Sequence, residues 1–223
     1  MRKGFGNEKK CNFFDVWGKF WEKDSGMRRS VAFSCIFALV LEFAATAHAA
    51  NWKVDRSHTT VGFSVSHLFT SVQGRFDRFD GTIEFDPENH EAAVVRATVD
   101  ASSINTNNTK RDKHLRSNDF FDVEKYPTLS FESIGGVTVM KKNRGKLAGN
   151  LTIHGVTKAV VFDVTFHGQG KDPWGNVRAG FTASVNINRK DYGLNWNEVL
   201  ETGGWLVGDE VEIRIDVEGI LEE

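Results

Sequence analysis

Apolar and polar side chains alternate along two adjacent runs within residues 145–166, and this period of two constrains the fold more than any other feature of the sequence. Successive side chains of an extended strand point to opposite faces, so the pattern puts the apolar side chains of each run on one face. Those side chains are Leu147, Gly149, Leu151 and Ile153 in the first run and Val160, Phe162, Val164 and Phe166 in the second. The two runs flank a turn at Gly155 and therefore predict two half-buried antiparallel strands.

The same alternation continues through most of the sequence after residue 50, where it predicts an all-β fold. Further apolar faces lie in residues 61–65, 79–85, 93–99, 129–131, 177–187 and 211–217. Together with the first pair they give about eight strands. An open sheet of this size leaves two edges of unpaired backbone groups, and closure removes both. We therefore expect an eight-stranded antiparallel barrel with its apolar faces inside.

Residues 102–123 interrupt this pattern with a polar and charged segment. Within it, residues 108–115 can form one or two helical turns, and they are the one short helical segment that we expect in the domain. The segment ends close to Phe120 and Phe121. Two interpretations of this pair stay open: a flap over the mouth of the barrel, or a plug that closes one end as ordinary core.

The first 49 residues are expected to lie outside the folded domain. Residues 27–49 have the parts of a secretory signal peptide: basic residues at the start, a short apolar stretch, and small residues on both sides of His48. The apolar stretch is shorter than the roughly 20 residues that span a bilayer. Residues 1–26 are interpreted as an upstream extension, with a long amphipathic n-region as the alternative. We predict cleavage near Ala49, a periplasmic or secreted product, and one domain over residues 50–223 without a transmembrane segment.

Charge and histidine spacing disfavour several partners for residues 50–223. This part of the chain keeps 20 of the 28 Lys and Arg residues and 25 of the 30 Asp and Glu residues, a net charge of −5. Such a protein is a poor partner for nucleic acid or for an anionic membrane surface. Both cysteines precede residue 50, so thiolate chemistry is not expected. His58 and His67 are nine residues apart and fall on opposite faces of a regular strand, so no metal site is predicted.

Several short motifs follow one another in an order that resembles a known family. They are Trp52-Lys53-Val54-Asp55 with Ser57-His58, Val65-Ser66-His67-Leu68, Gly74-Arg75-Phe76, Asp119-Phe120-Phe121-Asp122, the hairpin 149–158, and Ile187-Asn188-Arg189-Lys190-Asp191-Tyr192-Gly193-Leu194. Over residues 51–223 the chain is similar to the YceI-like polyisoprenoid-binding family, whose fold is a lipocalin-like barrel. The resemblance implies a secreted or periplasmic protein that binds a long isoprenoid lipid inside the barrel.

A polyisoprenoid tail needs a long apolar channel, and the inward faces of the strands supply the candidate lining. An eight-stranded barrel is just wide enough to be filled by side chains or to hold one slender ligand. The predicted lipid-contact residues are Phe63, Val65, Phe85, Phe120, Phe121, Phe131, Leu151, Ile153, Phe162, Val164, Phe166, Phe181, Val185, Ile213 and Val217. The alternative is a barrel core packed solid, with no ligand.

Three polar residues are candidates for contacts to a lipid head group: His58, Arg189 and Asp191. Each also has a structural interpretation, because His58 beside Asp55 can complete a polar network and Arg189 with Asp191 can form a buried ion pair. No catalytic residue, metal or cofactor is predicted, and the expected ligand is a polyisoprenoid or isoprenoid-quinone lipid. The alternatives are an envelope enzyme that uses His58 and Asp55 or Arg189 and Asp191, and a stress-induced envelope protein with a protein partner. A homodimer stays open.

Overall fold

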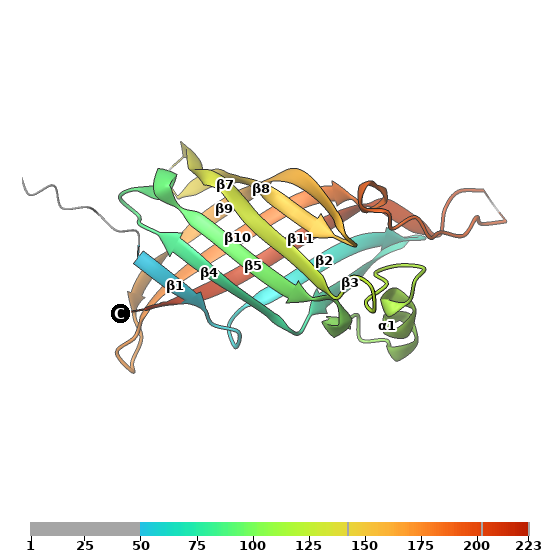
Figure 1. Ribbon diagram of the computed structural model, residues 1–223, viewed down its shortest axis with the longest axis horizontal. Coiled ribbons are helices and arrows are strands. Elements are labelled where there is room, and N and C mark those ends of the chain that lie inside the picture. The colour runs from blue at the N-terminus through green and yellow to red at the C-terminus, as the bar shows by residue number, and fades with distance from the viewer. Residues whose placement is uncertain (1–49, 142, 202, 223) are drawn as a thin grey trace, which may run out of the picture. The chain divides into compact units, whose positions relative to one another are not determined.

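The computed structural model describes residues 50–141, 143–201 and 203–222, which form one antiparallel sheet and a single α-helix (Figure 1). The strands are β1 (Ala50–Val54), β2 (Thr60–His67), β3 (Thr70–Phe76), β4 (Phe79–Phe85), β5 (Val94–Asp100), β6 (Ile104–Asn105), β7 (Thr128–Lys141), β8 (Arg144–Ile153), β9 (Val156–Lys171), β10 (Val177–Asn188) and β11 (Val207–Leu221). The helices are α1 (Thr109–Arg116) and the short 3-10 turns η2 (His90–Ala92), η3 (Ala101–Ser103) and η4 (Arg189–Tyr192). The predicted leader lies outside the described residues.

The eleven strands close into a barrel of eight, because β1 with β2, β3 with β4, and β5 with β6 are each two parts of one interrupted strand. Its neighbours run β1-β4-β5-β7-β8-β9-β10-β11, and β11 pairs with β1 to close the ring. The C-terminal part of β11, residues 219–221, pairs with β1, and residues 207–216 pair with β2 along the same edge. β3 and β6 continue β4 and β5 in the same way. The predicted eight-stranded antiparallel, lipocalin-like barrel is therefore confirmed.

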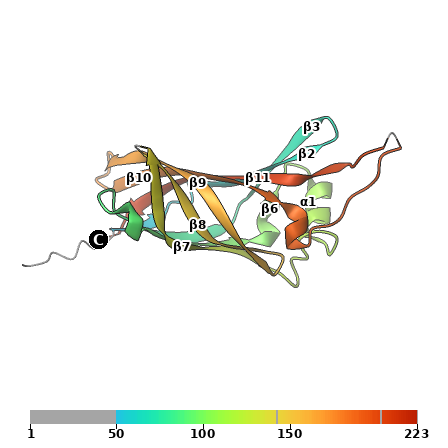
Figure 2. The same ribbon diagram turned by 90° about the horizontal axis from the view of Figure 1, so that it is seen from above.

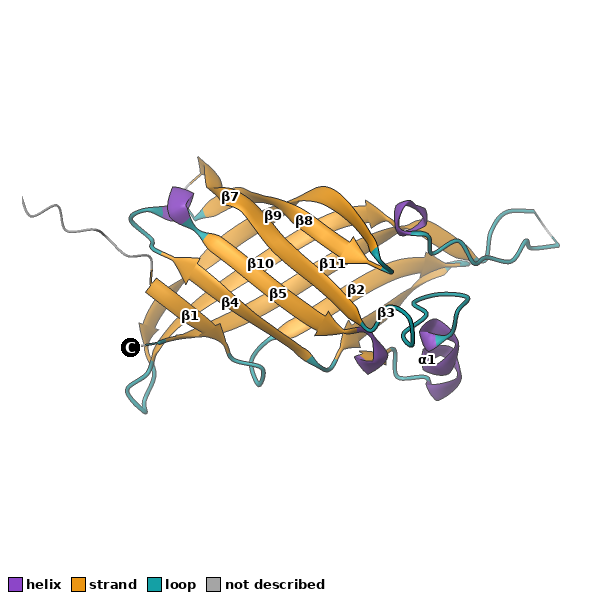
Figure 3. Ribbon diagram, viewed as in Figure 1, coloured by secondary structure: helices purple, strands orange, loops and turns teal. Residues whose placement is uncertain are grey.

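The two ends of the barrel carry different elements (Figure 2). One end, called the helix end below, carries α1, the β2–β3 hairpin, η4 and the loop 195–206. The other, called the hairpin end, carries the β9–β10 hairpin together with the start of β1 and the end of β11 (Figure 3). Among the described residues, no helix combines the length and the apolar character that crossing a bilayer would require.

The turn between β8 and β9 shows how the opening sequence pattern sets the register. His154 and Gly155 have φ angles of 51° and 74°, and Ile153 pairs with Val156 across them. Two central residues with positive φ form the type of turn whose twist matches that of the flanking strands. Leu147 consequently pairs with Phe162, and both side chains are buried. The predicted hairpin is confirmed.

A glycine on β8 makes room for a large ring inside the barrel. A Cβ atom at Gly149 would lie 2.4 Å from the ring of Phe131 on the neighbouring strand β7. The Phe131 ring therefore lies over Gly149, and its centroid is 5.1 Å from that of Phe162. Small and large side chains alternate between neighbouring strands here because a second large residue would collide with the first.

The helix α1 forms where the sequence pattern predicted it, and local polar contacts fix its position. The Asn108 side chain caps its N-terminus by accepting a hydrogen bond from the Arg111 backbone N–H at 3.1 Å. Asp112 is buried, and its carboxylate accepts hydrogen bonds from the Thr106 N–H at 2.9 Å and the Thr106 hydroxyl at 2.5 Å. The helix is thereby tied to the chain that leaves β6.

Two clusters of buried apolar side chains hold the barrel together, one toward each end. The helix-end cluster is Phe76, Ala101, Ile104, Leu129, Leu151, Ile153, Tyr192 and Leu194. The hairpin-end cluster is Trp52, Ile83, Phe85, Ala93 and Ala179. Neither cluster fills the whole interior, and a cavity remains inside the barrel.

Candidate functional site

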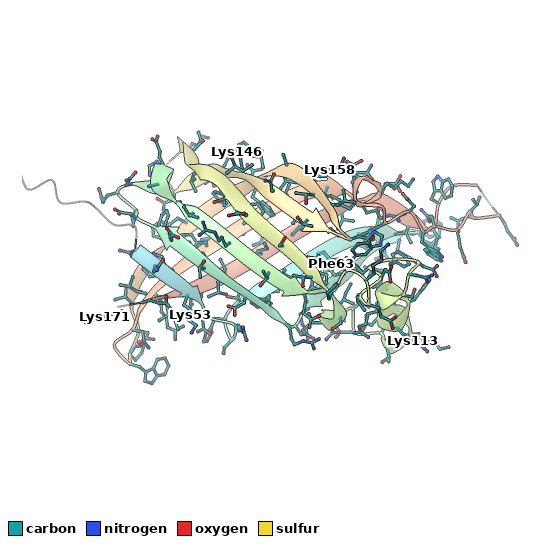
Figure 4. All side chains as sticks on the ribbon, viewed as in Figure 1. Lys53, Phe63, Lys113, Lys146, Lys158 and Lys171 are labelled. Carbon is teal, nitrogen blue, oxygen red and sulfur yellow. The ribbon has the colours of Figure 1, made fainter. Side chains whose placement is uncertain are left out.

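A cavity of about 850 Å³ runs inside the barrel. Its lining reaches Pro87, His90 and Asn143 toward the hairpin end, and His114 and Trp196 at the helix end. Between these limits the walls are mostly apolar side chains of the strands. The labelled lysines Lys146 and Lys158 lie on the outside of the barrel (Figure 4). The interior is therefore not packed solid, which was the alternative that the sequence left open.

Fourteen of the fifteen residues predicted to contact a lipid line this cavity. They come from strands β2, β4 and β7–β11 and from the segment after α1, and they are Phe63, Val65, Phe85, Phe120, Phe121, Phe131, Leu151, Ile153, Phe162, Val164, Phe166, Phe181, Ile213 and Val217. Val185 is half-buried on β10 but is not part of the lining, although Ala183 and Ile187 on either side of it are. Alternation along the strands thus identified wall residues correctly, although many other residues also line the cavity.

Three phenylalanines pack against one another at the hairpin end of the cavity. The ring centroid of Phe85 is 5.1 Å from those of Phe166 and Phe181, and the latter two are 5.3 Å apart. Edge-to-face and tilted contacts at these distances stabilise aromatic groups beyond the area they bury. This aromatic trio makes the wall at the hairpin end rigid and apolar.

Phe120 and Phe121 lie at the helix end, as part of a second aromatic group. Phe120 is buried, with its ring 5.1 Å from both the His114 and the Trp196 rings. The Phe121 ring meets Phe76 edge-on at 5.9 Å. Both line the cavity. Both side chains pack against aromatic neighbours at the helix end, and the flap and plug interpretations stay open.

Basic side chains line the helix end of the cavity: Lys110, Arg111, His114 and Arg189. The Arg111 guanidinium donates to the Thr106 hydroxyl at 2.7 Å and to the Thr106 carbonyl at 2.8 Å, both neutral oxygens. The sequence prediction included Arg189 but not the three helix residues. Their spacing of three and four positions places them on one helix face together, a signal that could have identified them once α1 was expected.

Arg189 is buried, with 4% of its surface exposed, and backbone carbonyls surround it. Its guanidinium donates to the carbonyls of Leu194 at 2.5 Å, Trp196 at 2.8 Å and Gly208 at 2.9 Å. Burial lowers the pKa of Arg189, an effect that Asp209 partly offsets. Asp209 is 3.4 Å away and is also paired with Lys190.

The predicted ion pair between Arg189 and Asp191 is therefore wrong, because the carboxylate that faces Arg189 belongs to Asp209. Asp191 is exposed and does not line the cavity, whereas Asp209 on β11 faces the guanidinium. Arg189 and Asp191 both belong to η4, but the turn buries the Arg189 side chain and leaves Asp191 exposed. Of the three predicted head-group residues, Arg189 lines the cavity and the other two do not.

The third of them, His58, belongs to a charged cluster that does not line the cavity. Its Nδ1 is 2.8 Å from the Asp55 carboxylate. Arg178 also contacts Asp55, at 2.6 Å, as well as Asp172 at 2.7 Å and Glu218 at 2.5 Å. Hydrogen bonds from Arg178 hold the pKa values of Asp55 and Asp172 well below their usual range. This is the polar network that the sequence offered as the structural interpretation of His58.

The same cluster contains three groups close enough together to hold a metal ion. Ligand atoms of Asp55, His58 and Glu218 lie within 4.8 Å of one another. The Arg178 guanidinium already donates to both carboxylates. A positive charge of the protein itself therefore occupies the position where a cation would bind.

Fold and cavity together define the class of protein: a closed eight-stranded β-barrel built around a mostly apolar cavity. The YceI-like domain model matches residues 52–219, and the chain belongs to that family. A relative called UPF0312 protein from Pseudomonas aeruginosa is 42% identical over 184 residues, which cover 80% of this chain and 91% of the relative.

Two solved structures have the same fold. The crystal structure of Burkholderia cenocepacia BcnA matches with a TM-score of 0.66 and 24% identity, over 74% of this chain and 98% of that one. A polyisoprenoid binding domain from Saccharophagus degradans, implicated in plant cell wall breakdown, matches with a TM-score of 0.59 and 17% identity, over 78% of this chain and 99% of that one. At these identities the likeness concerns the fold.

Proposed function

We propose that this chain is an exported protein that binds a polyisoprenoid or isoprenoid-quinone lipid in its cavity and stores or transports it through an aqueous compartment. One observation carries the proposal: the apolar cavity of about 850 Å³ enclosed by the strands. Its volume lies within the range of about 300–1,000 Å³ typical of pockets for small molecules and cofactors. The printed description of the Saccharophagus degradans domain names the same class of ligand.

The chemistry of the wall suits a long hydrocarbon tail. Each buried methylene contributes roughly 0.8 kcal/mol, so ten buried carbons supply about 8 kcal/mol before the costs of association. The aromatic trio at the hairpin end and the phenylalanines at the helix end offer such contacts along the whole cavity. The tail thus provides affinity without any precisely placed polar group.

Several basic groups lie together at the helix end, where we place the head of the lipid. Arg111 and Arg189 both line the cavity there and bring guanidinium N–H donors. A quinone or other oxygen-bearing head group accepts hydrogen bonds from such donors. His58 and Asp191 are not part of this arrangement because neither lines the cavity.

Binding, not catalysis, is the activity that we propose. The pair of His58 and Asp55, which an enzyme would need as base and acid, does not line the cavity. Arg189 donates hydrogen bonds to three backbone carbonyls, and these contacts suit a residue that positions the loop after η4. Export rests on the sequence of residues 27–49 and on the family resemblance.

Mass spectrometry of an organic extract from the purified protein tests the proposal. We expect about one isoprenoid lipid per chain, matching the large cavity inside the barrel. Ala183 lines the cavity and its neighbour Ser184 points to the opposite face of β10, so Ala183→Phe should lower the lipid content and Ser184→Phe should not. An extract without isoprenoid from well-folded protein, or equal lipid in the two variants, would contradict lipid binding in this cavity.

A further inference from the structure

Several exposed apolar side chains lie at the helix end of the barrel, on chain segments that adjoin the cavity. Four large hydrophobic residues stand out there: Leu68 is 47% exposed, Phe69 100%, Val199 69% and Trp205 58%. They are called the apolar rim below. The other exposed large hydrophobics of the described residues, Ile134, Val161 and Trp174, lie on separate strands or loops.

Contacts between two chain segments hold the apolar rim together. Leu68 and Phe69 form the tip of the β2–β3 hairpin, and the Leu68 N–H donates to the Leu206 carbonyl at 3.1 Å. Val199 pairs with Trp205 across the loop 195–206. Both segments project beyond the barrel at the helix end (Figure 2). The rim is therefore a structural unit and not a set of unrelated side chains.

The rim is continuous with the mouth of the cavity. His67, Leu206 and Val207 line the cavity, and each is next or nearly next in sequence to a rim residue. Trp196 connects the same loop to α1 through its ring contact with His114, at 4.8 Å. An apolar molecule that leaves the cavity at this end reaches the rim first.

We propose that the apolar rim docks on the surface of a lipid bilayer, with the tips of the hairpin and the loop inserted among the lipid head groups. Trp and Lys are the residues that favour this boundary, and Lys190 lies over the Trp205 ring at 5.5 Å. The exposed Glu198 and Glu201 flank Val199, so the rim has no excess of positive charge. The bilayer that suits it is zwitterionic, and binding depends on apolar insertion and little on salt.

A second copy of the chain is the other occupant that such a surface could accept, and the dimensions disfavour it. A stable protein interface takes about 800 Å² and roughly 20–30 residues from each partner. The rim offers four apolar side chains on two projecting tips. Tips of this kind insert into a soft bilayer more readily than they form a flat, complementary interface.

Co-sedimentation of the purified full chain with phosphatidylcholine vesicles tests the proposal. Because Phe69 would bury its side chain in the bilayer, Phe69→Ser should weaken vesicle partitioning by about tenfold or more. Phe69 is fully exposed, and the substitution removes no packing from the fold. Trp174→Ser is the matched control, because Trp174 is 81% exposed on the β9–β10 hairpin at the opposite end of the molecule.

The expected result is vesicle binding by the wild type, a tenfold loss in Phe69→Ser and Trp205→Ser, and no more than a twofold change in Trp174→Ser. Absence of vesicle binding by the wild type, or an equal loss in Trp174→Ser, would overturn the proposal. So would a wild-type dimer in sedimentation that Phe69→Ser converts to monomer. Lipid extracted from the same variants is measured separately, so a failure of lipid binding in the cavity is distinguished from a failure of docking.

Discussion

The two ends of the barrel differ in where their hydrogen-bonded arginines lie relative to the cavity. At the hairpin end the interior is aromatic, and the Arg178 cluster with its three carboxylates does not line the cavity. At the helix end Arg111 and Arg189 line the cavity and donate mainly to neutral oxygens. The Arg178 ion pairs lie outside the cavity, whereas Arg111 and Arg189 line it, and Arg189 has one carboxylate, that of Asp209, at 3.4 Å.

This difference matters because the two arginines are compensated in different ways. A cation that remains near water and contacts three carboxylates is easily accommodated, whereas a buried guanidinium loses its hydration and needs compensating acceptors. Arg189 obtains them from three carbonyls of the loop and of β11. At the hairpin end the arginine is thus held by carboxylates away from the cavity, whereas at the helix end guanidinium groups border it.

Replacing one phenylalanine at each end should give the largest difference in the free energy of unfolding between the two ends. Phe85→Ala removes the centre of the aromatic trio, a side chain only 7% exposed, and should lower the free energy of unfolding by about 3–4 kcal/mol. Phe120→Ala should cost about 1–2 kcal/mol, because Phe120 packs against α1 and the loop 195–206, which can move to fill the space.

Urea unfolding measures both values. If Phe120 closes the end at which a ligand enters, Phe120→Ala should change the lipid content more than Phe85→Ala does. Equal losses of stability in the two variants would show that both ends belong to one uniformly packed core.

Much of the fold could be predicted from the sequence because a period of two is a local signal. The turn at Gly155, the inward faces and the helix after Asn108 all follow from residues near one another in the chain. The breaks between β1 and β2, β3 and β4, and β5 and β6 did not follow. They depend on how distant strands meet around the closed ring, which no local pattern records.

The candidate site was predictable to the extent that it consists of strand faces. Twelve wall residues were found by alternation, and Phe120 and Phe121 by their place after the helical segment. Val185 was included wrongly in the wall by the rule of alternation. Asp209 was missed as the partner of Arg189 because they are 20 positions apart and meet only through the pairing of β10 with β11. Long-range contacts of polar side chains are the part that sequence reasoning could not reach.

Arg189→Lys tests whether the buried cation at the helix end acts through its shape. Lysine keeps the charge but cannot present N–H groups to the carbonyls of Leu194 and Trp196 and to β11 at once. We expect a loss of about 2 kcal/mol in the free energy of unfolding. Arg214→Lys is the matched control on the outer face, where the exposed pair with Asp216 should change stability by less than about 0.5 kcal/mol. Similar losses in both variants would contradict the special role of Arg189.

Arg178→Met tests the charged cluster at the hairpin end through its pH dependence. The pKa values of Asp55 and Asp172 are lowered in the folded protein, so their contribution to stability is full above the ordinary carboxyl pKa of about 4. It disappears as the pH falls from there toward the lowered values. The variant should therefore be clearly less stable than the wild type near pH 7, and the difference should shrink below about pH 4. Thermal unfolding at several pH values measures this, and a difference independent of pH would exclude an electrostatic origin.

Tyr192→Phe should have the smallest effect at neutral pH and a distinct one in alkali. Tyr192 is 2% exposed, and among the described residues its hydroxyl has no hydrogen-bond partner, so its removal should change stability by no more than about 1 kcal/mol. Burial raises its pKa to about 12, above the ordinary value of about 10. The folded state then holds the proton more tightly than the unfolded state, and the wild type should lose stability as the pH rises from about 10 through about 12. Tyr192→Phe lacks this proton and should lose less stability over that range, so coincident alkaline unfolding profiles would show that the hydroxyl is not buried in the folded helix end.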